Sequence, residues 1–181
     1  MKNSLIIAMA TVLAFTGAAN AQTTSNSNAT ANAQVITPIT MTNGGVQGTD
    51  NLEFGTIINS ANGGSVVVSP TSVDFSTTTY NGVSPYTGTG SITPHRATFI
   101  IGGQAGYTYS TTLTINGAGF NDPNAVLSDL TTNVNQSSQT LGSAGESGYV
   151  TDEIYVGGTV TLTSSAAGTY AGSINCAVTY N

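Results

Sequence analysis

The strongest constraint on the fold is a regular alternation of side chains over residues 169–180, immediately before Asn181. One face of this pattern carries Tyr170, Gly172, Ile174, Cys176, Val178 and Tyr180, and the other carries Ala171, Ser173, Asn175, Ala177 and Thr179. Successive side chains of a β-strand point to opposite faces, so the pattern predicts a half-buried strand. Burial of each large apolar side chain contributes roughly 1.5–3 kcal/mol, enough for this strand to anchor a core. The sequence stops one residue later, and we expect an open strand edge that favours assembly over catalysis.

Residues 1–21 have the pattern of a secretory signal peptide. Lys2 supplies the positive start, and residues 5–15 form an apolar run. Residues 19–21 have small side chains at both positions that a signal peptidase recognises. The run is too short for a membrane span, which needs about 20 apolar residues. We therefore expect export to the periplasm, the cell surface or the medium, without membrane insertion.

The mature chain, residues 22–181, is expected to form a single β-sandwich domain in which residues 22–28 are flexible. A chain of this size buries about 70% of its unfolded surface. Arg96 is its only Lys or Arg against eight Asp and Glu, which gives a net charge of 1 − 8 = −7. Nucleic acids and anionic lipids are bound through clusters of Lys and Arg, so the composition excludes both as partners.

Nine segments have the side-chain pattern of strands, and no segment after the leader has the period of a helix. The expected strands are 29–41, 51–58, 65–69, 73–80, 96–101, 107–115, 125–132, 154–162 and 169–180. Asn-Gly pairs at residues 43–44, 62–63, 81–82 and 116–117 predict turns, and Gly-Gly pairs at 102–103 and 157–158 predict turns or bulges. Pro38 places the first strand at an edge or a break. Short strands without intervening helices predict an all-β, antiparallel sandwich.

The residues that could carry chemistry are few. His95 is the sole histidine, so a metal site with several histidines is impossible, and its place between Pro94 and Arg96 suggests an exposed strand end. Asp152 and Glu153 are adjacent and would point to opposite faces of a strand, so they cannot pair as an acid/base dyad. We expect no enzymatic activity and assign no catalytic, cofactor-binding or metal-binding residue.

Three further groups of side chains leave alternatives open. Asp122, Asp129 and Glu146 could gather around calcium, but their spacing matches no calcium loop, and they are otherwise solvated charges. Cys176 is the single cysteine, which excludes an intrachain disulfide and leaves a core residue or an intermolecular bond. Tyr107 and Tyr109 could stack on sugar rings, although packing in the core with Leu113 and Ile115 is favoured. The alternation around Cys176 likewise favours a position of its side chain in the core.

Four segments in order give the chain a family resemblance. They are residues 29–40 (ATANAQVITPIT), 51–57 (NLEFGTI), 97–103 with 107–113 (ATFIIGG and YTYSTTL), and 156–162 running into 167–180. Together they resemble the bacterial secreted family catalogued as domain of unknown function 4402. The resemblance covers nearly all of the mature chain and implies a fold more than an activity.

A looser resemblance carries the functional expectation. Leu52-x-Phe54-Gly55 near the start, and Gly168-Thr-Tyr170 before a last strand ending at Tyr180, are similar to chaperone–usher pilus subunits of the spore-coat-U-like, archaic type. This resemblance implies an immunoglobulin-like sandwich with an incomplete edge, which a neighbour's N-terminal strand fills. Such pilins commonly carry a disulfide near their first strand, and here the single cysteine lies in the last.

The N-terminal segment leaves two interpretations. Residues 29–33 offer alanines at odd positions, which bury little apolar area, so the segment is either a donor for a neighbour or a strand of its own domain. The function expected is an exported structural or adhesive surface protein, a fimbria-like subunit that self-assembles with a periplasmic chaperone and usher. The alternative is a free secreted binding module for a polysaccharide or another surface ligand.

Overall fold

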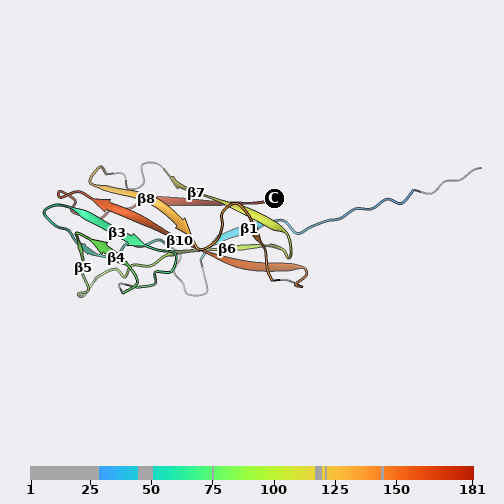
Figure 1. Cartoon of the computed structure of the whole chain (residues 1–181), viewed down its shortest axis with the longest axis horizontal. Coiled ribbons are helices and arrows are strands. Elements are labelled where there is room, and N and C mark those ends of the chain that lie inside the picture. The colour runs from blue at the N-terminus through green and yellow to red at the C-terminus, as the bar shows by residue number, and fades with distance from the viewer. Residues whose placement is uncertain (1–28, 45–50, 75, 117–119, 121, 144) are drawn as a thin grey trace, which may run out of the picture. The chain divides into compact units, whose positions relative to one another are not determined.

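The computed structural model describes residues 29–44, 51–74, 76–116, 120, 122–143 and 145–181 (Figure 1). The expected signal peptide and the expected flexible segment 22–28 lie outside the described residues. The chain divides into two compact units, Met1–Val35 and Ile36–Asn181. In the first unit, the described residues 29–35 are all exposed and belong to no strand.

The second unit is built from antiparallel strands, and its described residues contain no helix. This confirms the predicted all-β, antiparallel class. The largest sheet has six strands: β1 (Thr40–Asn43), β3 (Gly64–Val68), β4 (Thr79–Asn81), β6 (Ala97–Gln104), β8 (Ala125–Thr132) and β10 (Tyr149–Leu162). A second sheet has the order β11–β7–β9, and β2 pairs with β5; their bounds are β2 (Ile57–Ile58), β5 (Ser84–Pro85), β7 (Thr108–Asn116), β9 (Gln139–Thr140) and β11 (Ser173–Tyr180).

The long strand β10 holds the six-stranded sheet together. Its first half pairs with β6, and its second half pairs with β3 and β8. Val156 is the crossing point, because it pairs with Ala97 of β6 and with Thr132 of β8. Since β8 and β3 flank the same stretch of β10, β3 lies on the edge of β10 that β6 uses, beyond the end of β6. β1 and β4 then extend the sheet beyond β6 and β3.

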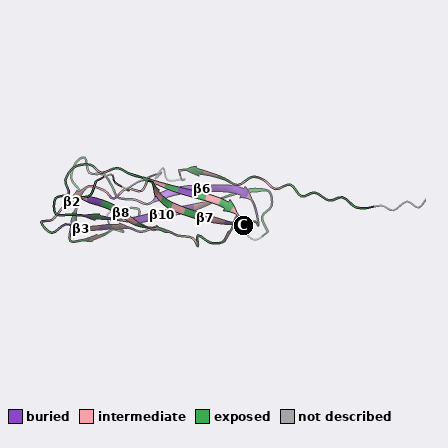
Figure 2. Cartoon of the chain, turned by 90° about the horizontal axis from the view of Figure 1, so that it is seen from above, coloured by how far each residue is buried: buried purple, intermediate pink, exposed green. Residues whose placement is uncertain are grey.

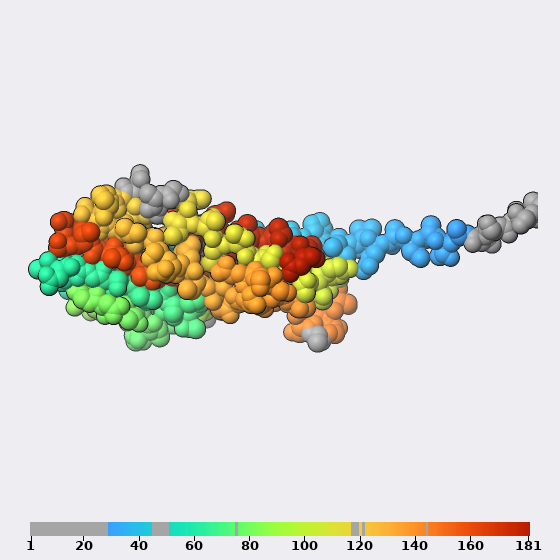
Figure 3. Space-filling model, turned by 45° about the horizontal axis from the view of Figure 1, so that its top comes forward, coloured from blue at the N-terminus to red at the C-terminus, as the bar shows by residue number. Residues whose placement is uncertain are grey.

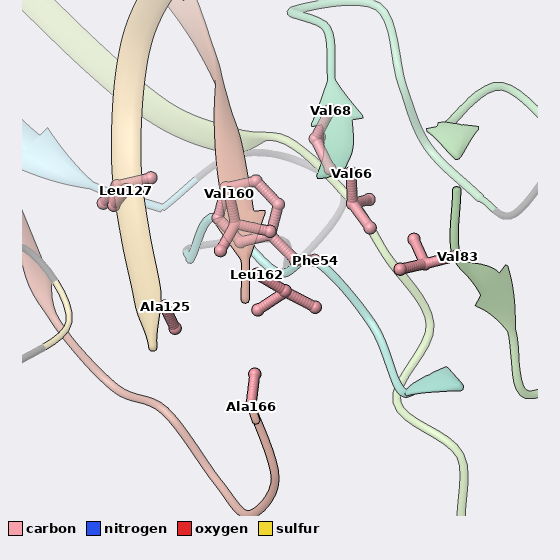
Figure 4. Packing of buried hydrophobic residues seen from close by; sticks show 9 residues of the cluster. All are labelled: Phe54, Val66, Val68, Val83, Ala125, Leu127, Val160, Leu162 and Ala166. Atoms are coloured by element: carbon pink, nitrogen blue, oxygen red, sulfur yellow. The ribbon is translucent and has the colours of Figure 1, made fainter. Parts of the chain in front are cut away.

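The core consists of two apolar clusters, each contributed by more than one strand. The first surrounds the second half of β10, and its side chains converge in Figure 4: Phe54, Val66, Val68, Val83, Ala125, Leu127, Val160, Leu162 and Ala166. The second joins the two larger sheets: Ala97, Phe99, Ile101, Tyr109, Leu141, Ile154, Val156 and Cys176. The buried stretches of β6 and β10 are the purple strands of Figure 2.

The two Gly-Gly pairs lie inside strands and form no turn between them, and neighbouring backbone or side-chain atoms leave little room for a Cβ there. A Cβ on Gly157 would lie 2.1 Å from the carbonyl oxygen of Val68. In β6, Cβ atoms on Gly102 and Gly103 would collide with the hydroxyl groups of Tyr149 and Tyr180. The register between β10 and β8 also shifts between Gly157 and Thr159, which agrees with the predicted bulge.

The strand predictions were accurate for the buried elements and largely wrong over 29–41, 51–58 and 73–80. Within 51–58, only Ile57 and Ile58 are in a strand. β8 has the predicted bounds, and β3, β6 and β7 lie within a few residues of theirs. The prediction of a strand over 29–41 was wrong up to Ile39, because Pro38 lacks an amide hydrogen and the alanines bury little surface. Over 73–80, only Thr79 and Tyr80 are in a strand, because the Asp74 side chain accepts hydrogen bonds from the amides of Ser76 and Thr77 and forms a turn.

The terminal strand begins at Ser173 and not at Thr169, so the predicted strand 169–180 is too long by four residues. Its alternation is otherwise as predicted. The Cys176 side chain is buried, those of Ile174, Val178 and Tyr180 are partly buried, and the intervening side chains are exposed. β5 and β9, two residues each, were not predicted, because segments this short carry no detectable alternation.

We predict that Gly157→Ala destabilises the domain, because the new methyl group has no room beside Val68. Overpacking of this kind lowers the free energy of unfolding by about 1–3 kcal/mol. Urea unfolding followed by circular dichroism measures the change. Thr131→Ala is the matched control, because Thr131 is exposed and pairs with Gly157 in β8. Equal stability of both variants would contradict the close packing.

Candidate functional site: an apolar groove beside the last strand

A groove of about 770 Å³ opens into the first core cluster. One side is formed by residues 51–57 and the other by residues 166–174. Its floor is apolar and comes from three strands: Phe99 of β6, Leu127 of β8, and Val160 and Leu162 of β10. Core side chains therefore line a space that none of the described residues fills.

Three aromatic rings line the groove. Phe54 and Phe120 meet edge to face with their ring centroids 6.1 Å apart, and Phe120 and Tyr170 are 6.2 Å apart. The Tyr170 hydroxyl group accepts a hydrogen bond from the Ala167 amide at 2.8 Å and lies 3.1 Å from the Ala167 carbonyl, to which it donates. The three rings connect the two sides of the groove.

Backbone hydrogen bonds fix the side formed by residues 51–57. Glu53 and His95 exchange two bonds, of 2.9 and 3.0 Å, and the Thr56 amide donates to the Ile92 carbonyl at 3.2 Å. On the other side, the Asn59 side-chain amide donates to the carbonyls of Thr163 and Ala166 at 2.8 and 3.0 Å. Both sides of the groove are therefore tied to the domain.

The last strand borders the groove with an unpaired edge. β11 is the end strand of its sheet and pairs with β7 over its whole length, and the structure pairs it with no other described strand. Ser173 and Ile174, at the start of β11, line the groove. An unpaired strand edge is a template for another strand, and here it lies beside a groove lined by the partly buried rings of Phe120 and Tyr170.

The other end of β11 is locked to the start of the domain. The Tyr180 hydroxyl group accepts a hydrogen bond from the Gln104 amide at 2.7 Å and donates one to the Thr37 carbonyl at 2.9 Å. The Thr37 hydroxyl group also donates to Oε1 of Gln104 at 3.3 Å. The tyrosine ring packs against Tyr107 with the centroids 5.8 Å apart. Figure 3 shows the dark red last residues next to the light blue residues near the start of β1.

The residues that the sequence singled out do not gather into a site. His95 lies outside the named strands, in its bridge with Glu53, and its Nδ1 is 3.2 Å from the Arg96 carbonyl oxygen. Asp152 accepts a hydrogen bond from the Gly142 amide, and Glu153 accepts one from the Tyr155 hydroxyl group.

The carboxylates considered for calcium are each occupied locally. Asp122 accepts from the Asn124 amide, Asp129 from the Ser128 hydroxyl group, and Glu146 from the Ser143 amide. Within the described residues, no group of three or more His, Cys, Asp or Glu is placed to hold a metal ion.

Arg96 packs against an aromatic ring. Its guanidinium carbon lies 3.7 Å from the ring centroid of Tyr155, and its amide donates to the Ser72 carbonyl at 3.0 Å. The hydrogen bond from Tyr155 to Glu153 is the main cause of a raised pKa of the Tyr155 phenol. This cluster stabilises the junction of β6 and β10, and it lines no groove.

Cys176 and Tyr109 are core residues, as the alternation favoured. Cys176 is 3% exposed and Tyr109 is 1% exposed, which excludes Tyr109 from any exposed row of aromatic rings. Leu113 packs against the same cluster as Tyr109, whereas Ile115 packs against the first cluster. The preferred interpretation was therefore right for Tyr109 and Cys176.

The groove itself was not predicted from the sequence. Phe54 and Tyr170 belong to the motifs that carried the resemblance, but no signal in the sequence marked them as neighbours. Phe120 lies between strands and was not singled out. Residues from such distant segments meet through long-range pairing, of β7 with β11 and of Glu53 with His95.

Residues 39–180 match the family described as Domain of unknown function (DUF4402), and the chain belongs to this family. The expected family is thereby confirmed. Neither a curated protein nor a solved structure matches the chain. The described residues include no helix of the length and apolar character needed to cross a membrane.

We predict that Tyr180→Phe loosens the link between Thr37 and the last strand. The variant keeps the ring but leaves the Gln104 amide without its acceptor, which costs about 1–3 kcal/mol where water is excluded. Tyr149→Phe is the control, because the Tyr149 hydroxyl is exposed and contacts Thr40 at 3.3 Å. Faster hydrogen exchange of the Gln104 amide in Tyr180→Phe alone is the expected result. Equal hydrogen exchange of the Gln104 amide in both variants would contradict the link that Tyr180 forms between Thr37 and the last strand.

The buried thiol predicts a specific pH dependence of stability. Burial raises the pKa of Cys176 from 9.0 to about 11, so the native state holds this proton more tightly than the unfolded chain. Stability must then fall as the pH rises from about 9, where the unfolded thiol ionises, to about 11. Tyr109, with its pKa raised to about 12 chiefly by burial, adds a similar loss beginning near its ordinary value of 10.0.

The variant Cys176→Ala removes the contribution of the thiol to the pH dependence of stability and keeps the contribution of Tyr109. Between about pH 8 and about pH 10.5, urea unfolding of the wild type should lose more free energy than that of the variant. Identical pH profiles would show that the Cys176 thiol ionises equally in both states.

Proposed function

We propose that the protein is an exported, fimbria-like structural or adhesive subunit that assembles by β-strand addition at the groove. In this proposal the domain is an immunoglobulin-like sandwich whose incomplete edge is completed by another strand. One observation carries the proposal: the unpaired edge of β11 and the open floor of the core occur at the same place. An added strand would satisfy the backbone groups of β11 and cover the floor together.

The energetic argument rests on both kinds of surface. Apolar area removed from water contributes roughly 25 cal/mol per Å², and the groove is lined by the partly buried Leu52, Phe120 and Tyr170, which pack against the first cluster. Backbone hydrogen bonds to β11 add main-chain affinity that does not depend on side chains. A small-molecule ligand would cover the floor but would leave the edge of Ser173 and Ile174 unpaired.

The resemblance to archaic chaperone–usher subunits supports the same proposal. It adds partners, because a subunit with an open core needs a periplasmic chaperone before assembly and an outer-membrane usher for export. The expected leader peptide agrees with that route. Cell-surface localisation is part of this proposal.

A second candidate, a binding module for a polysaccharide, is favoured by the chemistry of the groove lining. Aromatic rings stack on sugar rings, and Phe120 and Tyr170 are partly exposed there. Asn51, Glu53 and Thr169 line the same groove and supply polar groups. The volume of about 770 Å³ is also in the range of ligand pockets. A monomeric protein that binds glycans through Tyr170 would favour this candidate.

The test of the proposed function is the native size of the protein released from cells, measured by light scattering and electron microscopy. We expect long oligomers for the wild type. The double variant Ala171→Lys, Ser173→Lys places two lysines beside the groove. It should remain a folded monomer, because charges at a strand edge block strand pairing. Thr112→Lys, an exposed position on β7 away from the groove, is the control and should assemble normally. A wild type that is monomeric at every concentration would contradict the proposal.

A further inference from the structure

The half of the large sheet formed by β1, β6 and the first half of β10 has an outer face that points away from the core. These strands pair side by side, and their residues Met41, Ile101 and Ile154 pack into the second core cluster (Figure 1). Successive side chains of a strand point to opposite faces, so the alternate residues of the same strands lie on the outer face. The outer face includes Thr40, Thr42, Ile100, Tyr149, Thr151 and Glu153.

Tyr149 lies across the outer face. Its residue belongs to β10, but a Cβ on Gly102 of β6 would collide with its hydroxyl group, which therefore covers the backbone of β6. The same hydroxyl group lies 3.3 Å from the Thr40 hydroxyl group on β1. Tyr149 is nevertheless 56% exposed. The ring is therefore held against the sheet while more than half of the residue stays open to solvent.

A fixed polar cluster lies farther along the same face. Six residue steps on β10 separate Tyr149 from Tyr155, which corresponds to about 20 Å at the usual rise per residue. The Arg96 guanidinium carbon lies 3.7 Å from the Tyr155 ring centroid, and the Tyr155 hydroxyl group donates to Oε2 of Glu153 at 2.7 Å. A guanidinium group has several N–H donors and a carboxylate has several acceptor positions. Both groups can therefore bind hydroxyl groups of a ligand in addition to these contacts.

The chemistry of the outer face fits a neutral polysaccharide better than it fits a protein. The face of an aromatic ring is electronegative and attracts the slightly positive C–H groups of a sugar ring. Thr42 and Thr151 are exposed on the same face and supply hydroxyl groups. The centre of a protein interface is, in contrast, depleted of charged residues such as Arg96 and Glu153. The formal net charge of −6 disfavours an acidic polysaccharide.

We propose that the outer face binds a neutral polysaccharide chain, with one sugar ring stacked on Tyr149 and a later sugar bonded to Glu153 and Arg96. The separation of these groups along β10 suits an extended chain and not a single sugar. The inference goes beyond the proposed assembly and does not rest on it. Phe99, which lines the groove, points to the core side of β6, so the groove and the outer face lie on opposite sides of this sheet.

Biolayer interferometry of the whole protein tests the inference, with sensors coated with hydroxyethylcellulose, starch, mannan or galactomannan. We expect the wild type to bind at least one of these polysaccharides. Tyr149→Ala should weaken that binding about tenfold, because it removes the aromatic surface, whereas Tyr149→Phe keeps the ring and should bind nearly as well as the wild type. Tyr86→Ala is the matched control, because Tyr86 is 42% exposed and lies outside the outer face.

A second variant keeps the test decisive if Tyr149→Ala does not fold, which circular dichroism shows. Thr151→Glu adds a larger, charged side chain beside Tyr149 and leaves the cover over Gly102 in place. Thr151 is exposed, so the variant should fold and should also bind at least about tenfold more weakly, because the added side chain obstructs the sugar.

Each outcome supports or overturns the inference. Weaker binding in the Tyr149→Ala or Thr151→Glu variant, with unchanged binding in Tyr86→Ala, supports it. Equal binding by the wild type and the folded variants would overturn it, as would a wild type that binds none of the four polysaccharides. Loss of binding in Tyr170→Ala alone would place the sugar in the groove and would also overturn it. The native size of the protein, which tests the proposed function, is measured separately and does not depend on any of these results.

Discussion

The pairing of β10 with three other strands is the constraint on which the rest of the domain depends. Val156 meets β6 on one edge and β8 on the other, and β3 continues the edge that β6 leaves. This arrangement requires glycine at position 157, where the carbonyl of Val68 approaches too closely for any Cβ. It also divides the core into two clusters, one beside each half of β10. The first cluster is the one that remains partly uncovered.

The groove arises because the two ends of β11 have different neighbours. At its C-terminal end, Tyr180 joins Thr37 and Gln104, so that the second cluster is closed by residues preceding and including β1. At its N-terminal end, residues 168–172 run outside any strand, and no described strand other than β7 pairs with Ser173. The groove and the edge of β11 that β7 does not use therefore lie side by side. A single added strand would pair with this edge and cover the groove, and this is the basis of the proposed assembly.

The sequence was sufficient to predict strands where side chains alternate between core and solvent. The faces of β11 and the bounds of β8 could be predicted because burial on one face imposes a period of two. The sequence was insufficient to predict the structure of residues 29–39 and 73–78. Their β-branched and polar residues are typical of strands, but local hydrogen bonds or the lack of a pairing partner prevent strand formation. The groove could not be predicted, because Phe54, Phe120 and Tyr170 are brought together by long-range strand pairing.

The central claim is that the first residues of β11, which pair with β7 on one edge, gain a strand partner on their other edge only when another chain supplies one. Amide hydrogen exchange of Ser173, Ile174 and Asn175, compared between the monomeric and the assembled protein, tests it most directly. The account predicts that the amides in this stretch not bonded to β7 exchange rapidly in the monomer and become strongly protected on assembly. Equal protection in both states would contradict it, because the edge would then be paired within a single chain.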